Sequence, residues 1–187
     1  MNRILKFALV SLSICVLAWL AFGFFGIQAL FIDREVEEEI PESISELIVQ
    51  SNNETTEASE NNSHGELVGK GAFKQGDSTY TIQGNAFLSR IDGKLSLTFT
   101  DFEVSNGPDL FVYAVGSDNT ENRAVKEAVA SGKFINLGRL KGNIGDQSYE
   151  LESKVSLNDY GVIAIWCRRF SRNFGSADLT SSSPSDR

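Results

Sequence analysis

The feature that most constrains this chain is an uncharged, largely apolar run of 26 residues, from position 7 to position 32. Arg3 and Lys6 precede the run, and Asp33 follows it. About 20 apolar residues cross a bilayer as a helix, so the run is long enough to span one with some tilt. Basic residues on its N-terminal side predict a cytoplasmic N-terminus, with the rest of the chain outside the cytoplasm.

A cleaved signal peptide is the alternative interpretation of this run. Its apolar core is usually only about 7–15 residues long, which is much shorter. No clear small-x-small cleavage site follows, although Gly26 and Ala29 are small. A lipoprotein signal at Cys15 is disfavoured because bulky Ile14 precedes it and the apolar run continues far beyond it. We therefore predict a single-pass membrane protein with its short cytoplasmic end and transmembrane helix in residues 1–32.

The distribution of charge separates a linker from a folded domain. The chain of 187 residues has a net charge of -8, yet residues 33–66 hold eleven acidic residues against one basic residue, Arg34. In residues 67–187 the charges cancel, with fourteen of each sign. A neutral domain without a basic stripe offers nucleic acid no binding surface. Residues 33–66 are acidic and rich in Ser and Asn, which predicts a disordered stalk with some helix limited by Pro41.

Residues 67–179 have the pattern of short strands between turns. Residues 95–99 alternate strictly between apolar and polar side chains, directly after the hairpin signal Asp92-Gly93. Many such strands at roughly 8–12-residue spacing predict an all-β, β-sandwich-like domain. Residues 180–187 form a polar tail that we predict to be disordered.

One strand and one helix stand out within that domain. The continuous apolar run Val162–Cys167 predicts a central strand that is covered on both faces. Residues 124–129 are the only segment with a helical pattern, with Asn119 or Thr120 as the cap and Gly132 as the stop. The alternation also predicts a set of core residues: Leu97, Phe99, Phe111, Tyr113, Leu137 and Ile165.

The residue types exclude several kinds of chemistry. The one histidine, His64, lies in the predicted stalk, and the one methionine is Met1. Haem held by a histidine–methionine pair is therefore excluded within the domain, as is a serine nucleophile with a histidine base. A cysteine thiolate could ligate haem iron alone, but no second signal supports it. No zinc-ligand cluster or phosphate-binding glycine loop is visible, so the sequence names no cofactor and no metal.

Cys167 is the only cysteine outside the N-terminal apolar run, and it stands at the end of the apolar strand. It therefore has no second cysteine within the domain with which to form a disulfide. Arg168 and Arg169 follow it, and a nearby cation favours the reactive thiolate. By strand alternation, Arg169 shares the side of Cys167, which makes it the candidate thiolate stabiliser, while Trp166 faces the other way. The alternative is that Cys167 is a small buried core residue.

Several blocks of sequence resemble the electron-transfer DM-thirteen domain in order and spacing, and the resemblance covers residues 67–179. They are Gly71-Ala72-Phe73, Phe102, Ser105-Asn106-Gly107-Pro108-Asp109-Leu110-Phe111-Val112-Tyr113, residues 137–149, Ile165-Trp166-Cys167-Arg168-Arg169-Phe170 and Phe174-Gly175-Ser176-Ala177-Asp178-Leu179. This family occurs alone on membrane-anchored microbial proteins and beside DOMON domains in animals.

The resemblance implies a β-sandwich-like, DOMON-like extracellular domain whose cysteine, matched here by Cys167, has been proposed to be redox-active. No DOMON or cytochrome domain accompanies the module in this chain, which predicts that any redox partner is a separate protein. Two functions remain open. One is a membrane-anchored redox module that uses Cys167. The other is a redox-inert adhesion or binding module on the cell surface.

Overall fold

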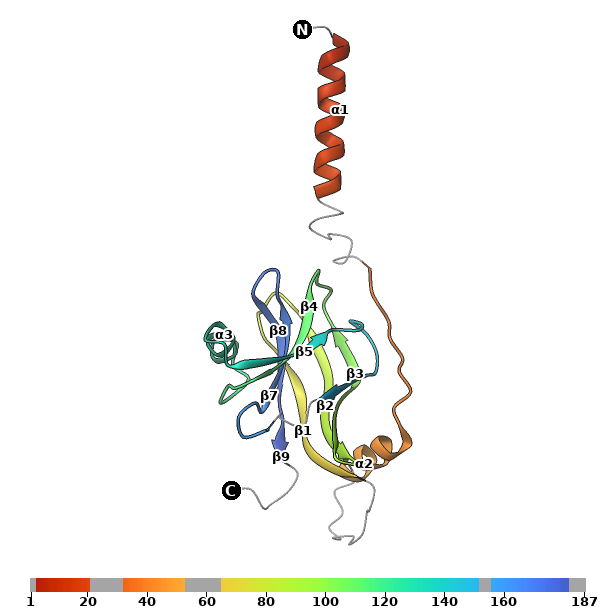
Figure 1. Ribbon diagram of the computed structural model, residues 1–187, viewed down its shortest axis with the longest axis vertical. Helices are drawn as coiled ribbons and strands as arrows, with labels where there is room; N and C mark the ends of the chain where they lie inside the picture. Colours follow the sequence, from red (N-terminus) through yellow and green to blue (C-terminus); the bar gives the residue numbers. More distant parts are fainter. Residues whose placement is uncertain (1–2, 21–31, 53–64, 152–155, 182–187) are drawn as a thin grey trace.

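The computed structural model describes residues 3–20, 32–52, 65–151 and 156–181 (Figure 1). The parts of the predicted membrane span, stalk and tail in residues 21–31, 53–64 and 182–187 lie outside these ranges. Its helices are α1 (Arg3–Trp19), α2 (Glu42–Asn52) and α3 (Asn122–Ala130), and its strands are β1 (Glu66–Gln75), β2 (Ile82–Ile91), β3 (Lys94–Val104), β4 (Leu110–Val115), β5 (Phe134–Arg139), β6 (Gln147–Leu151), β7 (Val162–Cys167), β8 (Arg172–Asp178) and β9 (Thr180–Ser181).

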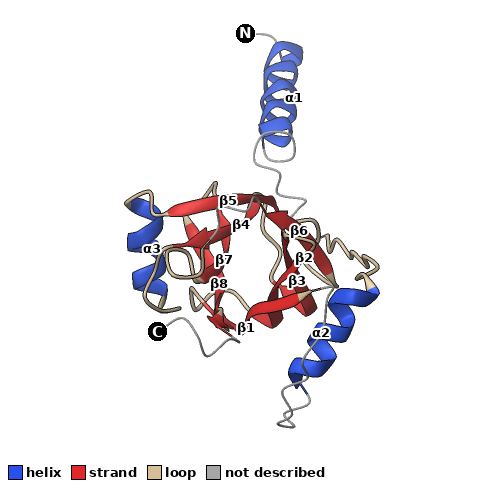
Figure 2. Cartoon of the chain, turned by 60° about the horizontal axis from the view of Figure 1, so that its bottom comes forward, coloured by secondary structure: helices blue, strands red, loops and turns tan. Residues whose placement is uncertain are grey.

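The strands form one sheet that curls into a nearly closed barrel (Figure 2). Their order is β5-β4-β7-β8-β1-β2-β3-β6, with β9 paired to β1. The long strand β1 links the two halves, because residues 66–72 pair with β2 and residues 73–75 pair with β8. The prediction of an all-β domain is confirmed.

Strand β7 lies inside the sheet, between β4 and β8, and all six of its residues are buried. Each of its two faces packs in a different hydrophobic cluster, as the continuous apolar run predicts. Ile163, Ile165 and Cys167 belong to the core inside the barrel. Val162, Ala164 and Trp166 belong to a second cluster on the outside, under α3. Five of the six predicted core residues are buried, and Leu137 is partly buried against the inner core.

Helix α3 is the predicted helix, and it covers the outer face of β4 and β8. Val125 and Ala128 are its buried residues, and they pack on the outer cluster. The predicted cap is wrong: Glu121 is the N-cap and makes no side-chain cap bond, while the Asn119 side chain accepts a hydrogen bond from the Glu121 backbone N–H at 2.9 Å. Asn119 therefore shapes the turn before the helix rather than its first turn.

Residues 33–38, here called the strap, lie along the barrel at the seam between β5 and β6. The backbone N–H of Val36 donates to the Ile144 carbonyl at 2.9 Å, and that of Glu38 donates to the Asp146 carbonyl at 3.1 Å. A Cβ at Gly142 would come within 2.5 Å of the Arg34 carbonyl oxygen. Much of the predicted stalk is thus packed on the domain, and α2 continues this packing against β1 and β2, with Ile44 buried.

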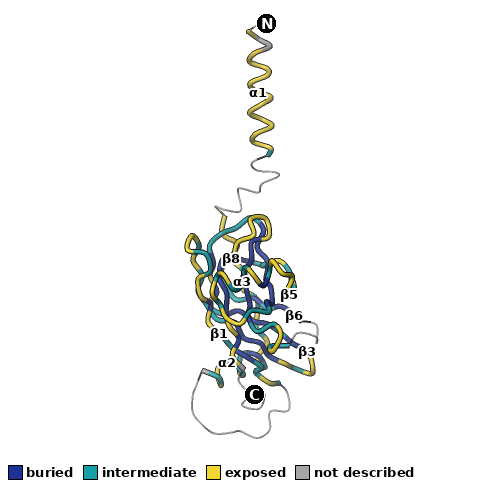
Figure 3. Tube along the Cα trace, turned by 90° about the vertical axis from the view of Figure 1, so that its left-hand side faces the viewer, coloured by how far each residue is buried: buried dark blue, intermediate teal, exposed yellow. Residues whose placement is uncertain are grey.

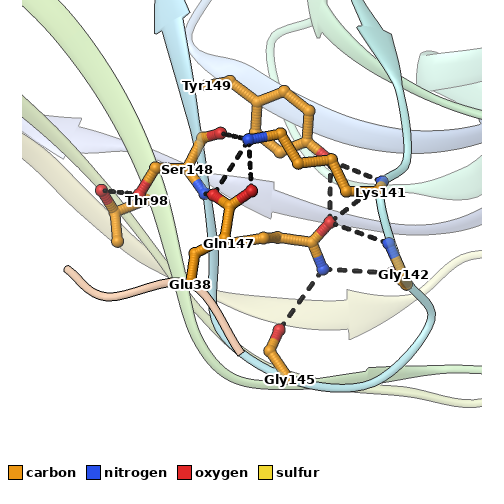
Figure 4. Close-up of polar contacts among 8 residues, drawn as sticks. All are labelled: Glu38, Thr98, Lys141, Gly142, Gly145, Gln147, Ser148 and Tyr149. Carbon is orange, nitrogen blue, oxygen red and sulfur yellow. Dashed lines mark hydrogen bonds and ion pairs between the residues drawn. The ribbon is translucent and has the colours of Figure 1, made fainter. Parts of the chain in front are cut away.

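A polar network around Gln147 fixes the strap to the seam (Figure 4). The Gln147 side-chain oxygen accepts hydrogen bonds from the backbone of Lys141 and Gly142 and from the Tyr149 hydroxyl, while its amide nitrogen donates to the carbonyls of Gly142 and Gly145. Lys141 Nζ lies 2.7 and 2.9 Å from the carboxylate oxygens of Glu38. The network joins the strap, the connection between β5 and β6, and strand β6.

Helix α1 stands apart from the barrel, and its residues 3 and 6–19 are exposed (Figure 3). Large apolar side chains are exposed along it, among them Phe7, Leu12 and Trp19. Within the described ranges, no helix combines the length and the hydropathy that crossing a bilayer requires, and α1 has 17 residues.

Candidate functional site

Cys167 is the last residue of β7, directly before the turn at residues 168–171 that leads into β8. Its Cα is paired with that of Leu110 on one side and that of Arg172 on the other. The residue is 0 % exposed, and its side chain belongs to the inner core together with Leu110 and Phe174. The predicted position at a strand end is confirmed, and the sulfur lies on the inner side of that end.

Backbone N–H groups from two turns lie close enough to Cys167 to lower the pKa of its thiol. They belong to Asp109, in the turn before β4, and to Arg169 and Phe170, in the turn after β7. Two turns that are distant in the sequence therefore supply donors to one thiol. They meet because the first residue of β4 pairs with the last residue of β7, and the Arg168 N–H donates to the Asp109 carbonyl at 3.0 Å.

The pKa of the Cys167 thiol is raised above its ordinary value, chiefly because burial penalises the charged thiolate. The three backbone donors work in the opposite direction, since they stabilise negative charge on sulfur, and the Asp109 carboxylate raises the pKa further. The resting group is thus a neutral thiol at neutral pH. Any thiolate that forms meets donors that are already in place.

Asp109 is the charged centre beside the sulfur. Its side chain is 8 % exposed and lies between two guanidinium groups, with Arg139 Nη2 at 2.7 Å and Arg168 Nε at 3.2 Å. The guanidinium carbons of Arg168 and Arg139 lie 4.3 and 5.2 Å from the centroid of the Phe111 ring, within cation–π range. Two cations and an aromatic face therefore compensate a nearly buried carboxylate next to the thiol.

The two arginines after Cys167 take different places. Arg169 reaches the sulfur through its backbone N–H, while its side chain is exposed. Arg168 is held by Asp109 and Phe111. Trp166 faces the outer cluster as predicted, with its ring centroid 6.4 Å from that of Tyr113.

Asp109 and Asp146 are carboxylates in glycine-containing turns, and both are engaged by protein groups. Asp146 accepts a hydrogen bond from the Asp101 backbone at 2.9 Å, and Asp109 holds its two arginines. Among the described residues, no group of three His, Cys, Asp or Glu side chains is placed to hold a metal ion.

Sequence reasoning missed the Asp109–Arg139–Arg168 cluster. In the sequence, Asp109 follows Asn106-Gly107-Pro108, which is typical of a turn, and Arg139 carries no signal because it stands 28 positions before Cys167. The one available hint was a carboxylate directly before the apolar run Leu110–Val115, which places it at a strand end. Only the pairing of β4 with both β5 and β7 brings the three side chains together.

The family model for the electron transfer DM13 domain matches residues 72–179, which includes Asp109, Arg139 and Cys167. The chain belongs to the electron transfer DM13 family. The match begins within β1, after the strap and α2. Neither the curated proteins nor the solved structures contain a match.

Proposed function

We propose that this chain is a membrane-anchored, extracytoplasmic electron-transfer protein in which Cys167 is the redox-active group. The observation that carries the proposal is that the single thiol of an electron transfer DM13 domain lies where two turns meet, beside three backbone N–H groups that lower its pKa. Aimed donors of this kind stabilise charge that develops on sulfur during the reaction, and they cost no reorganisation when it does.

The chemistry is an exchange with the disulfide of a separate protein partner. Cys167 loses its proton, and its sulfur attacks one sulfur of the partner's disulfide. A mixed disulfide forms, the partner's own S–S bond breaks, and the released thiolate takes up the proton. Cys167 is oxidised in this step, while the departing partner sulfur is reduced. Because the resting sulfur is buried, the turn at residues 168–171 has to open for a protein partner to reach it.

Residues 7–32 are the proposed membrane anchor. The barrel is the proposed DOMON-like domain, and it lies outside the cytoplasm. Large apolar side chains are exposed along α1, including Phe7, Leu9, Leu12, Ile14 and Leu17. A helix that is apolar all round is stable when apolar surroundings cover it, and lipid would do so. The uncharged sequence continues beyond α1 as far as Ile32, which gives the anchor the length to span.

The second candidate function is a redox-inert binding module on the cell surface. The burial of Cys167 and its raised thiol pKa favour this alternative, since both are typical of a cysteine that fills a core. The two candidates differ in one property, which is the reactivity of the native thiol.

That reactivity is measured by alkylating the full chain in detergent or vesicles, with Cys15→Ser removing the other thiol. We expect slow modification of Cys167 in the folded protein, with a rate that increases with pH because the thiolate fraction grows. Cys167→Ser gives the background of the labelling reaction. In a second experiment, the protein is incubated with the periplasmic or surface protein fraction. Mixed disulfides should form with the protein that keeps Cys167 and not with Cys167→Ser. Labelling of Cys167 only after unfolding, together with no trapped partner, would establish the binding module instead.

A further inference from the structure

The strap fixes which end of the barrel lies next to the end of the apolar run. Asp33 is the first residue after that run, and its carboxylate oxygen Oδ1 accepts hydrogen bonds from the side chains of Asn106 at 2.7 Å and Asn143 at 2.9 Å. Asn106 lies in the turn between β3 and β4. The chain therefore leaves the apolar run directly onto this end of the barrel, with no free length between them.

The turn between β7 and β8 is at the same end. β4 begins where β7 ends, and the Arg168 N–H donates to the Asp109 carbonyl across the two turns. Figure 1 shows both turns at the end of the barrel where the strap begins. The turn Asp92-Gly93 marks the opposite end, because the full length of β3 separates it from Asn106.

The side chains at the tip of the β7–β8 turn combine an apolar residue with cations. Phe170 is 49 % exposed, and it is the one large apolar side chain exposed to this degree in the described barrel residues 65–151 and 156–181. Arg169 beside it is exposed, and the side chain of Arg168 is 55 % exposed. An aromatic ring flanked by arginines is the combination that binds the interface of a membrane.

A shallow pocket on this end is lined by further basic residues. It has a volume of about 160 Å³ and lies between the strap and the β3–β4 turn, with Arg34, Arg139 and Lys141 among its lining residues. Three carboxylates nearby are engaged: Asp109 is nearly buried under its two arginines, Asp33 accepts its two amide donors, and Glu38 pairs with Lys141. Exposed guanidinium groups of Arg34, Arg139 and Arg169 thus lie at this end, beside the exposed carboxylate of Glu35.

We propose that this end of the barrel docks on the anionic lipid surface of the membrane that holds the chain, with Phe170 entering the interface and the arginines contacting headgroup phosphates. The proposal rests on the proposed anchoring by residues 7–32. The docking places the turn over Cys167 against the membrane, so a redox partner that reaches the thiol approaches along the lipid surface. Anchoring alone would keep this end of the barrel near the membrane without requiring Phe170 to enter the interface.

The test replaces Phe170 with the photocrosslinking residue p-benzoyl-phenylalanine in the full chain, reconstituted in vesicles of phosphatidylethanolamine and phosphatidylglycerol. The matched control carries the same residue at Asp92, which is exposed at the opposite end. We expect lipid adducts at position 170 to exceed those at position 92 several-fold, by mass spectrometry. Arg169→Glu, or vesicles of phosphatidylcholine alone, should lower the yield at position 170 towards that of the control.

Two results would overturn the docking. Equal lipid adducts at positions 170 and 92, from chains that float with the vesicles, would show that the barrel is anchored but does not dock. Adducts of position 170 with a protein in native membranes, in place of lipid, would assign this tip to a protein partner. If the chain fails to float with vesicles at all, the anchoring fails together with the docking, and flotation tells this outcome from the others.

Discussion

Two polar clusters lie on the barrel, and they differ in how fully their charges and donors are matched. At the seam, Gln147 is 0 % exposed and both of its side-chain polar atoms are bonded, while Glu38 and Lys141 neutralise each other. At the end of β7, a neutral thiol faces three donors that would be better satisfied by an anion. The polar groups at the seam are therefore paired with one another, whereas the donors beside the thiol face a group without charge.

The difference separates a structural network from a site for chemistry. A fully satisfied buried network fixes one arrangement of the chain, and every group removed leaves partners unpaired. Donors aimed at an uncharged sulfur gain most of their energy only when the sulfur becomes negative. We therefore expect changes at the seam to alter stability without altering the thiol, and changes beside Cys167 to do the reverse.

The largest effect is expected for Gln147→Leu, which should lower the free energy of unfolding by about 3 kcal/mol. Leucine leaves the Lys141 and Gly142 N–H groups and the Tyr149 hydroxyl without this acceptor. Urea denaturation measures the loss, and Gln83→Leu, at an exposed position, serves as the control. A loss equal to that of the control would contradict the structural role of the network.

Next in size is the effect of Asp109→Asn on thiol reactivity. The Asp109 charge raises the pKa of Cys167, so its removal lowers that pKa and increases the thiolate fraction at neutral pH. We expect alkylation of Cys167 to become several-fold faster, with Arg139 and Arg168 no longer neutralised. Asp92→Asn, an exposed change of the same kind, is the control. An unchanged or slower rate of alkylation would show that the Asp109 charge does not limit the reactivity of the thiol.

A smaller effect is expected for Glu38→Gln, which should cost about 0.5–1 kcal/mol near neutral pH because the pair with Lys141 is only partly buried. Partial burial raises the Glu38 pKa, but the Lys141 and Ser148 hydrogen bonds and the Lys141 charge outweigh it and lower that pKa overall. The contribution is therefore present above the unfolded pKa and lost as pH falls through the lowered folded value.

Denaturation of wild type and Glu38→Gln across pH 3–7 checks this dependence, with Glu37→Gln as the exposed neighbour for comparison. The two stability curves should converge at acid pH. Curves that stay parallel would mean that the charge of Glu38 plays no part in holding the strap.

The smallest effect separates the two arginines after Cys167. Strand alternation predicts that Arg169→Ala slows alkylation of the thiol more than Arg168→Ala does. The contacts lead to the opposite expectation, because loss of Arg168 leaves the Asp109 charge less compensated, and that charge raises the thiol pKa. Rates for the two variants at one pH decide between them. Equal rates would mean that neither arginine side chain controls the alkylation rate of Cys167, which would leave that role to the backbone N–H groups.

The sequence was sufficient wherever a local pattern carried the information. Period-two alternation predicted the β domain, and the unbroken apolar run predicted that Val162–Cys167 is covered on both faces. It failed for Asp109 and Arg139 because ion pairs between residues 30 positions apart leave no local pattern. It also gave the strap no fixed place, since an acidic segment has no hydrophobic period, and backbone hydrogen bonds hold it at the seam.

By itself, then, the sequence determined the family, the all-β class and the identity of the one thiol within the domain, because each follows from the order and type of neighbouring residues. Tertiary structure alone decided the state of that thiol. Burial raised its pKa, and the meeting of two turns supplied its three donors. Burial and convergence depend on which strands pair, and pairing between distant strands is a property of the whole barrel rather than of any one segment.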